Sequence, residues 1–205
     1  TKSYYFFFKH SVYIILAILI LIVFSFLNQK ILTKFSLILF LIAFFSLMLV
    51  PFLGIEVKGS KRWLDLIFLP RFQPVEIIKP FFIVTLSLML TIQNRRLYFK
   101  YFLSTLLIFP ILMLLVYQPD IGQTLLISMV WLALIFVSGI NIIIFFMFFF
   151  LVVSVVSYLV IFVSKFEYIK IRLLAFLDSN SSNNYQAEKA SDAIINGGFF
   201  GKGIG

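Results

Sequence analysis

The chain has 205 residues, of which 62% are hydrophobic and 12% charged, and its formal net charge is +9. A soluble globular domain carries about 45–50% apolar and about 25% charged residues, so this composition excludes an ordinary soluble domain and indicates a protein of the lipid bilayer. The sequence contains no cysteine, which excludes disulfides and thiolate chemistry. Its basic residues are scattered among apolar runs and form no single basic face, so we expect no nucleic-acid partner.

Six apolar runs approach or reach the length of roughly 20 residues that a helix needs to cross a bilayer core. The predicted spans are 11–27, 35–53, 77–92, 99–117, 121–140 and 142–163. Transmembrane β-strands would be about 10 residues long and would alternate apolar with polar positions, whereas the last run is apolar on every face. The sequence therefore predicts an all-α, polytopic membrane helix bundle. We expect residues 1–205 to form a single integral membrane domain that is a fragment of a longer protein.

Positive charge in the short connections predicts the orientation of these spans. The connections at 28–34 and 93–100 contain Lys and Arg but no acidic residue, and such connections stay in the cytoplasm. Alternation of the spans then places the loops at 54–76 and 164–205 outside, the second as a large extracytoplasmic loop at the C-terminal end. All 8 acidic residues fall on that outer side. Many basic residues lie there too, so the opposite orientation stays open.

The segment 73–80, QPVEIIKP, places a charge pair at the start of a predicted span. Pro74 fits the first helical position, and Glu76 lies in the first turn, where negative charge is favoured. Glu76 and Lys79 share a helix face, and Pro80 removes a backbone hydrogen bond beside them and kinks the helix. The pair is either a well-formed helix start or a charged lining of a substrate cavity, and the residues alone favour neither.

Two further motifs on the predicted outer side carry polar chemistry. Arg62 and Trp63 have the chemistry to bind phosphate and a sugar or isoprenoid, but an interface anchor is the commoner role of such residues. Pro119 and Asp120 repeat the helix-start pattern, and Gly122 would let a neighbouring helix approach closely. A structural role is favoured here, although Asp120 is predicted to lie on the same side as Glu76.

The C-terminal part is polar and loop-like over 177–194 and then rich in glycine. Its backbone N–H groups could surround phosphate oxygens, with Lys202 supplying positive charge, and a flexible hinge is the alternative. The glycine spacing matches neither dinucleotide-binding nor P-loop patterns. The only histidine, His10, has no metal-ligating neighbours in sequence, so no zinc site is supported. No cofactor is identifiable, and a divalent cation stays open.

Three segments in this order resemble those of one bacterial family. They are GSKRWLDLIFLPRFQPVEIIKP, YQPDIGQTLLI and FLDSNSSNNYQAEKASDAIINGGFFGKGIG, and they resemble the SEDS proteins, the FtsW and RodA group of peptidoglycan polymerases. The resemblance implies a multi-pass protein of the bacterial cytoplasmic (inner) membrane. It also implies a glycosyltransferase that polymerises lipid II, an undecaprenyl-pyrophosphate-linked disaccharide peptide, at the outer face of this membrane during cell division.

The same resemblance implies roles for individual residues. Arg62, Lys79 and Lys202 are expected to bind phosphate, and Glu76 to support Lys79. The remaining candidate substrate-binding residues are Trp63, Gln73, Pro74, Asp120, Gln186, Gly197 and Gly198. The catalytic residue is unknown within this sequence, because the family's essential Asp is expected beyond Gly205, and the fragment is therefore expected to be inactive alone.

The resemblance also implies partners and leaves alternatives. A class B penicillin-binding transpeptidase and other membrane proteins of the divisome are the expected protein partners. The motifs favour an FtsW-type division protein over a RodA-type elongation polymerase. A transporter of the lipid-linked precursor (a flippase) is the alternative from another class, although the charges lie at span ends and not near the membrane midplane, where a translocation path would need them.

Overall fold

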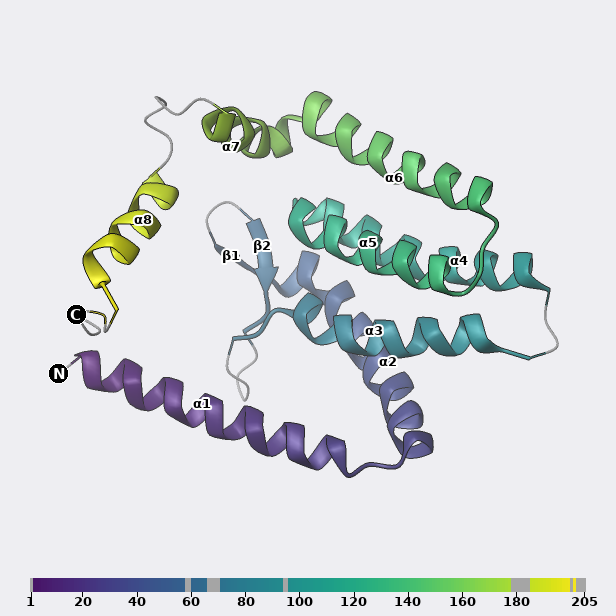
Figure 1. The fold of residues 1–205 in the computed structure, drawn as a ribbon, viewed down its shortest axis with the longest axis horizontal. Helices are drawn as coiled ribbons and strands as arrows, with labels where there is room; N and C mark the ends of the chain where they lie inside the picture. The colour runs from purple at the N-terminus through teal and green to yellow at the C-terminus, as the bar shows by residue number, and fades with distance from the viewer. Residues whose placement is uncertain are drawn as a thin grey trace. The chain divides into compact units, whose positions relative to one another are not determined.

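A computed structural model of the chain describes residues 2–57, 60–65, 71–93, 96–177, 185–199 and 201 (Figure 1). In chain order the elements are α1 (Lys2–Ser25), α2 (Gln29–Leu53), β1 (Ile55–Val57), β2 (Ser60–Trp63), α3 (Pro74–Thr91), α4 (Leu97–Tyr117), α5 (Ile121–Val137), α6 (Ile142–Phe162), the 3₁₀ turn η1 (Ser164–Phe166), α7 (Glu167–Leu177) and α8 (Tyr185–Gly197). They form two units. One comprises Thr1–Gln29 with Glu167–Gly205, and the other comprises Lys30–Phe166.

Long apolar helices confirm the predicted fold class. Among the described residues, five helices are long and apolar enough to cross a membrane, namely α1 over Tyr4–Ser25 and the whole of α2, α3, α4 and α6. Helices are expected here because a chain in lipid must satisfy every backbone N–H and C=O group internally. Helix α5 is equally apolar but has only 17 residues, so the count of six spans stays a prediction.

The larger unit is built around α5, which packs against α3, α4 and α6. Its core also includes the inner face of α2, and the side chains of Leu47, Ile78, Leu86, Ile111 and Ile135 have no exposed surface. By contrast, α6 buries none of its residues, although nearly all of them are apolar. An apolar helix surface that the protein leaves uncovered is suited to contact with lipid.

Polar side chains inside this bundle are mostly uncharged, and several of them bond to their own helix. The Ser104 hydroxyl donates to the carbonyl of Tyr101 at 2.7 Å and lies 3.3 Å from the indole Nε1 of Trp131, which donates to it. Thr124 and Ser128 likewise donate to carbonyls four residues before them. In the described parts of α2 to α6, charged residues occur only in the first two turns of a helix.

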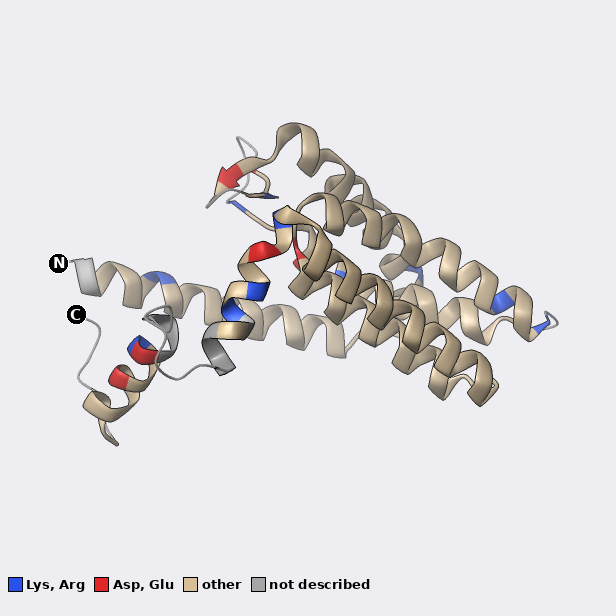
Figure 2. Cartoon of the chain, turned by 90° about the horizontal axis from the view of Figure 1, so that it is seen from above, with Lys and Arg blue, Asp and Glu red and all other residues tan. Residues whose placement is uncertain are grey.

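The polar end of the larger unit is organised by a β-hairpin. Strands β1 and β2 pair antiparallel between the end of α2 and the start of α3, and a bridge between Leu64 and Phe72 continues the pairing. Acidic residues of this unit gather at the hairpin end, whereas the opposite helix ends carry only Lys and Arg (Figure 2). The described part of the loop predicted between two spans therefore contains a β-hairpin.

Part of the C-terminal segment differs from the sequence prediction. Loop-like structure was expected through residue 194, but the chain is helical from Tyr185 to Gly197, and the described side chains of this helix are largely exposed. The error has a physical source. This stretch is polar, but it is also rich in Ala, Glu, Gln and Lys, which have high intrinsic helix propensity.

Gly54 makes the tightest backbone approach in the larger unit, and we predict that Gly54→Ala destabilises the full-length protein by about 1–3 kcal/mol, the usual cost of overpacking. Its amide donates to the carbonyl of Val50 at 2.8 Å, and a Cβ added at Gly54 would lie 2.3 Å from that same oxygen. The measurement is thermal unfolding of the purified protein in detergent.

Gly122→Ala is the matched control. A Cβ at Gly122 would meet only a side-chain oxygen of Asp120 at 3.9 Å, and alanine in a helix is expected to be neutral or slightly stabilising. Equal unfolding temperatures for the two variants would contradict the packing argument.

Candidate functional site

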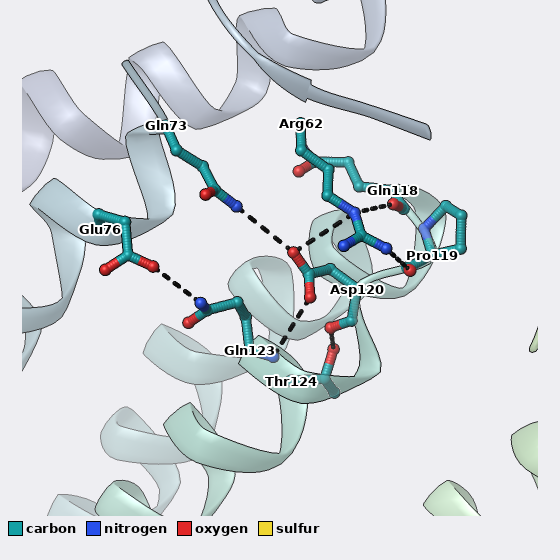
Figure 3. A network of polar contacts seen from close by, with 8 residues as sticks. All are labelled: Arg62, Gln73, Glu76, Gln118, Pro119, Asp120, Gln123 and Thr124. Atoms are coloured by element: carbon teal, nitrogen blue, oxygen red, sulfur yellow. Dashed lines mark hydrogen bonds and ion pairs between the residues drawn. The ribbon is translucent and has the colours of Figure 1, made fainter. Parts of the chain in front are cut away.

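Arg62 joins the hairpin to the turn between α4 and α5. Its guanidinium Nε lies 3.5 Å from the Asp120 carboxylate Oδ2 and 3.4 Å from the carbonyl oxygen of Gln118, and a terminal nitrogen donates to the carbonyl of Pro119 (Figure 3). The Arg62 side chain is 28% exposed and that of Asp120 only 8%. The partly buried Arg62 guanidinium thus forms an ion pair with the largely buried Asp120 carboxylate.

Asp120 is also the N-cap of α5. Its Oδ1 accepts from the backbone N–H of Gln123 at 3.4 Å, and its carbonyl accepts from the Thr124 hydroxyl at 2.8 Å. The side-chain amide of Gln73, at the N-cap position of α3, donates to the second carboxylate oxygen at 3.4 Å. The predicted helix-start role of Asp120 is confirmed, and the same side chain also connects three segments.

Glu76 forms a second connection between the same two helix starts. Its Oε1 accepts from the Gln123 side-chain amide at 2.8 Å, and its Oε2 lies 2.6 Å from the ammonium of Lys79. Gln73 and Glu76 of one segment therefore contact Asp120 and Gln123 of the other, three residues apart in both cases (Figure 3). The Glu76 side chain is still 51% exposed, so both of its oxygens are held while the group remains accessible.

The two connections offer different chemistry. In the Arg62–Asp120 pair, the guanidinium donors are directed to protein acceptors. The pair therefore holds the hairpin against the turn between α4 and α5 and has a structural role. The Glu76–Lys79 pair lies in the first turns of α3, beside Pro80, which cannot donate a backbone hydrogen bond to the Glu76 carbonyl. An accessible carboxylate and ammonium fixed in this way are suited to bind or polarise a charged substrate.

A cavity of about 370 Å³ opens at the same end of the unit. It is lined by Pro51, Glu56, Ser60, Lys61, Tyr117, Gln118, Pro119 and Lys165. We call it the cationic pocket, because its charged lining consists of Lys61, Lys165 and Glu56. Neither Lys61 nor Lys165 was predicted to be a site residue. The predicted alternation of spans puts both on the outer side, but nothing in the sequence pattern indicates that they line one cavity.

The other predicted site residues are placed as follows. Trp63 is at the end of β2 and 37% exposed, and Pro74 is buried at the first position of α3. Gln186 lies in α8, Gly197 ends that helix, and Gly198 follows it with φ +58°. These three belong to the smaller unit, and Lys202 lies outside the described residues. The Gly122 prediction is wrong, because among the described residues no neighbouring helix lies within 4 Å of a Cβ built at this position.

A bundle of apolar helices with its charged network confined to one end defines an integral membrane protein with a polar site at the membrane boundary. The family model that describes the FtsW, RodA and SpoVE cell cycle proteins matches residues 1–205. The chain belongs to this family. As the family and the long apolar helices show, it is a multi-pass protein of the bacterial inner membrane.

Curated relatives support the FtsW type. The chain is 32% identical to a probable peptidoglycan glycosyltransferase FtsW of Coxiella burnetii, over 98% of this chain and 55% of the relative. It is 33% identical to the protein of the same name from Buchnera aphidicola, over 84% of this chain and 49% of the relative. The chain thus spans about half the length of the curated relatives it matches.

Solved structures share the fold. The crystal structure of the rod shape determining protein RodA of Thermus thermophilus matches with a TM-score of 0.62 and 26% identity, over 72% of this chain and 49% of that chain. A second match has a TM-score of 0.69 and 26% identity, over 91% of this chain and 56% of that chain. That second structure is described as showing the structural coordination of polymerization and crosslinking by a peptidoglycan synthase complex.

We predict that Arg62→Ala lowers the free energy of unfolding of the full-length protein by about 1–3 kcal/mol, because it leaves the Asp120 carboxylate buried without its cation. Arg62→Ala combined with Asp120→Asn should cost less than the sum of the two single changes. Thermal and denaturant unfolding in detergent measure both effects.

Arg71→Ala provides the matched control. Arg71 pairs with Asp65 at 2.8 Å in the same loop, but the two side chains are 65% and 39% exposed, and an exposed pair contributes about 0–1 kcal/mol. Equal losses for Arg62→Ala and Arg71→Ala would contradict the bracing role of Arg62.

Proposed function

We propose that the full-length protein is a peptidoglycan glycosyltransferase that polymerises lipid II at the outer face of the cytoplasmic membrane during cell division. The names of the curated relatives support this activity. The observation that carries it in this chain is the doubly held but accessible Glu76 carboxylate beside Lys79. A polymerase acting on a lipid-linked sugar needs its charged groups at the membrane boundary, and the position of these two residues in the first turns of an apolar helix supports the proposal.

The reaction joins the 4-hydroxyl oxygen of one lipid-linked sugar to the anomeric carbon of another. The bond from that carbon to the pyrophosphate oxygen breaks, and the undecaprenyl pyrophosphate leaves. A carboxylate base takes the hydroxyl proton, and cations stabilise the charge on the leaving group. We propose that this base is an Asp outside the 205 residues, that Lys79 faces the pyrophosphate, and that Glu76 fixes the Lys79 ammonium.

The contacts suggest a revised role for Arg62. Nε and one terminal nitrogen of its guanidinium are already directed to Gln118, Pro119 and Asp120, which leaves fewer donors for a phosphate. We therefore propose that Arg62 and Asp120 are positioning residues, which hold Gln123 and through it Glu76. Roles for Trp63, Gln73, Pro74, Gln186, Gly197, Gly198 and Lys202 in substrate binding stay predictions.

A protein partner is part of the proposal. One of the matching structures is described as a peptidoglycan synthase complex that coordinates polymerization with crosslinking, and crosslinking is the chemistry of a transpeptidase. We propose that this protein acts beside a class B penicillin-binding transpeptidase and other divisome membrane proteins.

Transport of the lipid-linked precursor has less support in the structure. A translocation path would need charged or strongly polar groups near the membrane midplane. In the described parts of α2 to α6, the side chains of the middle turns are apolar or are Ser, Thr, Tyr and Trp. The charged groups at the hairpin end favour chemistry at the surface.

We predict that Glu76→Gln lowers lipid II polymerisation by the full-length protein about tenfold or more, because it removes the counter-ion of Lys79 while keeping a side chain that can still contact Gln123. The assay is gel analysis of glycan strands made from labelled lipid II by purified protein. Unfolding temperature checks that the variant remains folded.

Asp65→Asn is the control for this test. It removes a carboxylate from the same loop, but Asp65 pairs with the exposed Arg71 and has no place in the proposed site, so full activity is expected. Unchanged polymerisation in Glu76→Gln would overturn the proposed role of Glu76. Wild-type protein that moves lipid II across vesicles but makes no glycan would overturn the function itself.

The orientation has its own test, because the 205 residues contain no cysteine, so a cysteine introduced here is the only one in this part of the protein. We expect Lys61→Cys, at the hairpin end, to react with a membrane-impermeant maleimide added outside the inner membrane. Lys34→Cys, near the start of α2, should react only after the membrane is opened. The reverse pattern would place the hairpin in the cytoplasm and contradict the proposal.

A further inference from the structure

We propose that the cationic pocket is a binding site for an anionic phospholipid, separate from the Glu76–Lys79 pair. The pocket is lined by the last turn of α2, both hairpin strands, the α4–α5 turn and η1, and it includes neither Glu76 nor Lys79. This inference goes beyond the proposed polymerase activity and does not depend on it.

Strand geometry directs two adjacent cations to different sites. Successive side chains of a β-strand point to opposite faces, and in β2 exposed and half-buried residues alternate, so that Lys61 is exposed while Arg62 is half-buried. Arg62 turns to the Asp120 carboxylate, and Lys61 lines the pocket. Lys61 is therefore available to a ligand in a way that Arg62 is not.

The charge of the pocket suits a phosphodiester. Lys61 and Lys165 face one acidic residue, Glu56, in the lining, which leaves a small excess of positive charge. The phosphodiester headgroup of an anionic phospholipid carries about one negative charge and is attracted by such basic clusters. A lipid-linked diphosphate has more negative charge than this lining balances, so we assign the pocket to a phospholipid.

A buried donor supplies a second, independent indication of a ligand. The Gln118 side chain lines the pocket and the residue is only 4% exposed, yet its amide Nε2 has no hydrogen-bond partner in the described part of the chain. A buried N–H group without an acceptor is costly. This nitrogen has almost no accessible surface, so a ligand oxygen would become its acceptor only after the Gln118 side chain turns toward the pocket.

An apolar groove could hold the acyl chains of the proposed phospholipid. The groove, of about 190 Å³, runs between α4, α5 and α6, and its hydroxyl groups, on Thr124 and Ser128, donate to backbone carbonyls of their own helix. Along α4 it ends at Val116, and the next residue, Tyr117, lines the cationic pocket. The Lys165 ammonium lies 5.7 Å from the centre of the Tyr117 ring. The groove and the cationic pocket thus involve neighbouring residues at the end of α4, and we propose that the acyl chains occupy the groove.

The test uses full-length protein purified in mild detergent and mixed with phosphatidylglycerol or phosphatidylcholine. Native mass spectrometry counts the lipids retained, and unfolding temperature reports stabilisation by each lipid. Wild-type protein should retain phosphatidylglycerol preferentially. Lys61→Gln with Lys165→Gln should lower that retention about tenfold and abolish the stabilisation, since each surface lysine contributes to anionic lipid binding.

Lys30→Gln with Lys34→Gln is the matched control, because it removes the same charge from exposed lysines at the opposite end of the unit. Its retention of phosphatidylglycerol should stay within twofold of wild type. Equal retention by the pocket variant and wild type, or equal retention of the two lipids by wild type, would overturn the proposal. So would a pocket variant that keeps phosphatidylglycerol but loses an undecaprenyl diphosphate probe, because the pocket would then belong to the substrate site. Polymerisation is not a readout here, so failure of the polymerase proposal leaves this result interpretable.

Discussion

The arrangement of the polar end depends on a buried carboxylate. The Asp120 side chain is almost completely buried, and burying an unpaired charge at that position would destabilise the fold by several kcal/mol. The protein compensates it with the Arg62 guanidinium, the Gln73 amide and the N–H of Gln123. These donors come from β2, from the start of α3 and from α5, so satisfying one side chain brings three segments of the chain together.

The position of Glu76 follows from that constraint. The Gln73–Asp120 and Glu76–Gln123 contacts join residues with the same spacing on two helix starts, so fixing the first contact restricts where the second can form. Glu76 is far more exposed than Asp120. The network therefore has a buried part that sets geometry and an accessible part whose charges can act on a ligand.

The sequence predicted the features that depend on local pattern. Apolar runs predicted membrane helices, Pro74 correctly marked a helix start, and alternation of spans correctly placed Glu76 and Asp120 at one end. The sequence could not predict pairing between distant residues, because no local pattern indicates that Arg62, and not Lys61 or Arg71, contacts Asp120. Gly122 was misinterpreted for a related reason, since what approaches a glycine is a property of the packed bundle.

The two neighbouring cations Lys61 and Arg62 show how a short strand can separate structural from binding functions. Had this segment been helical, adjacent residues would have been about a third of a turn apart and would have shared much of one environment. In the hairpin the two side chains point to opposite faces, so the planar, permanently charged guanidinium pairs with the buried Asp120 carboxylate while the flexible ammonium stays at the surface. A Lys at position 62 could not make the forked contacts with Gln118, Pro119 and Asp120. The order Lys-Arg in the sequence is therefore a physical requirement of this site, and exchanging the two residues would weaken the brace without changing composition or net charge.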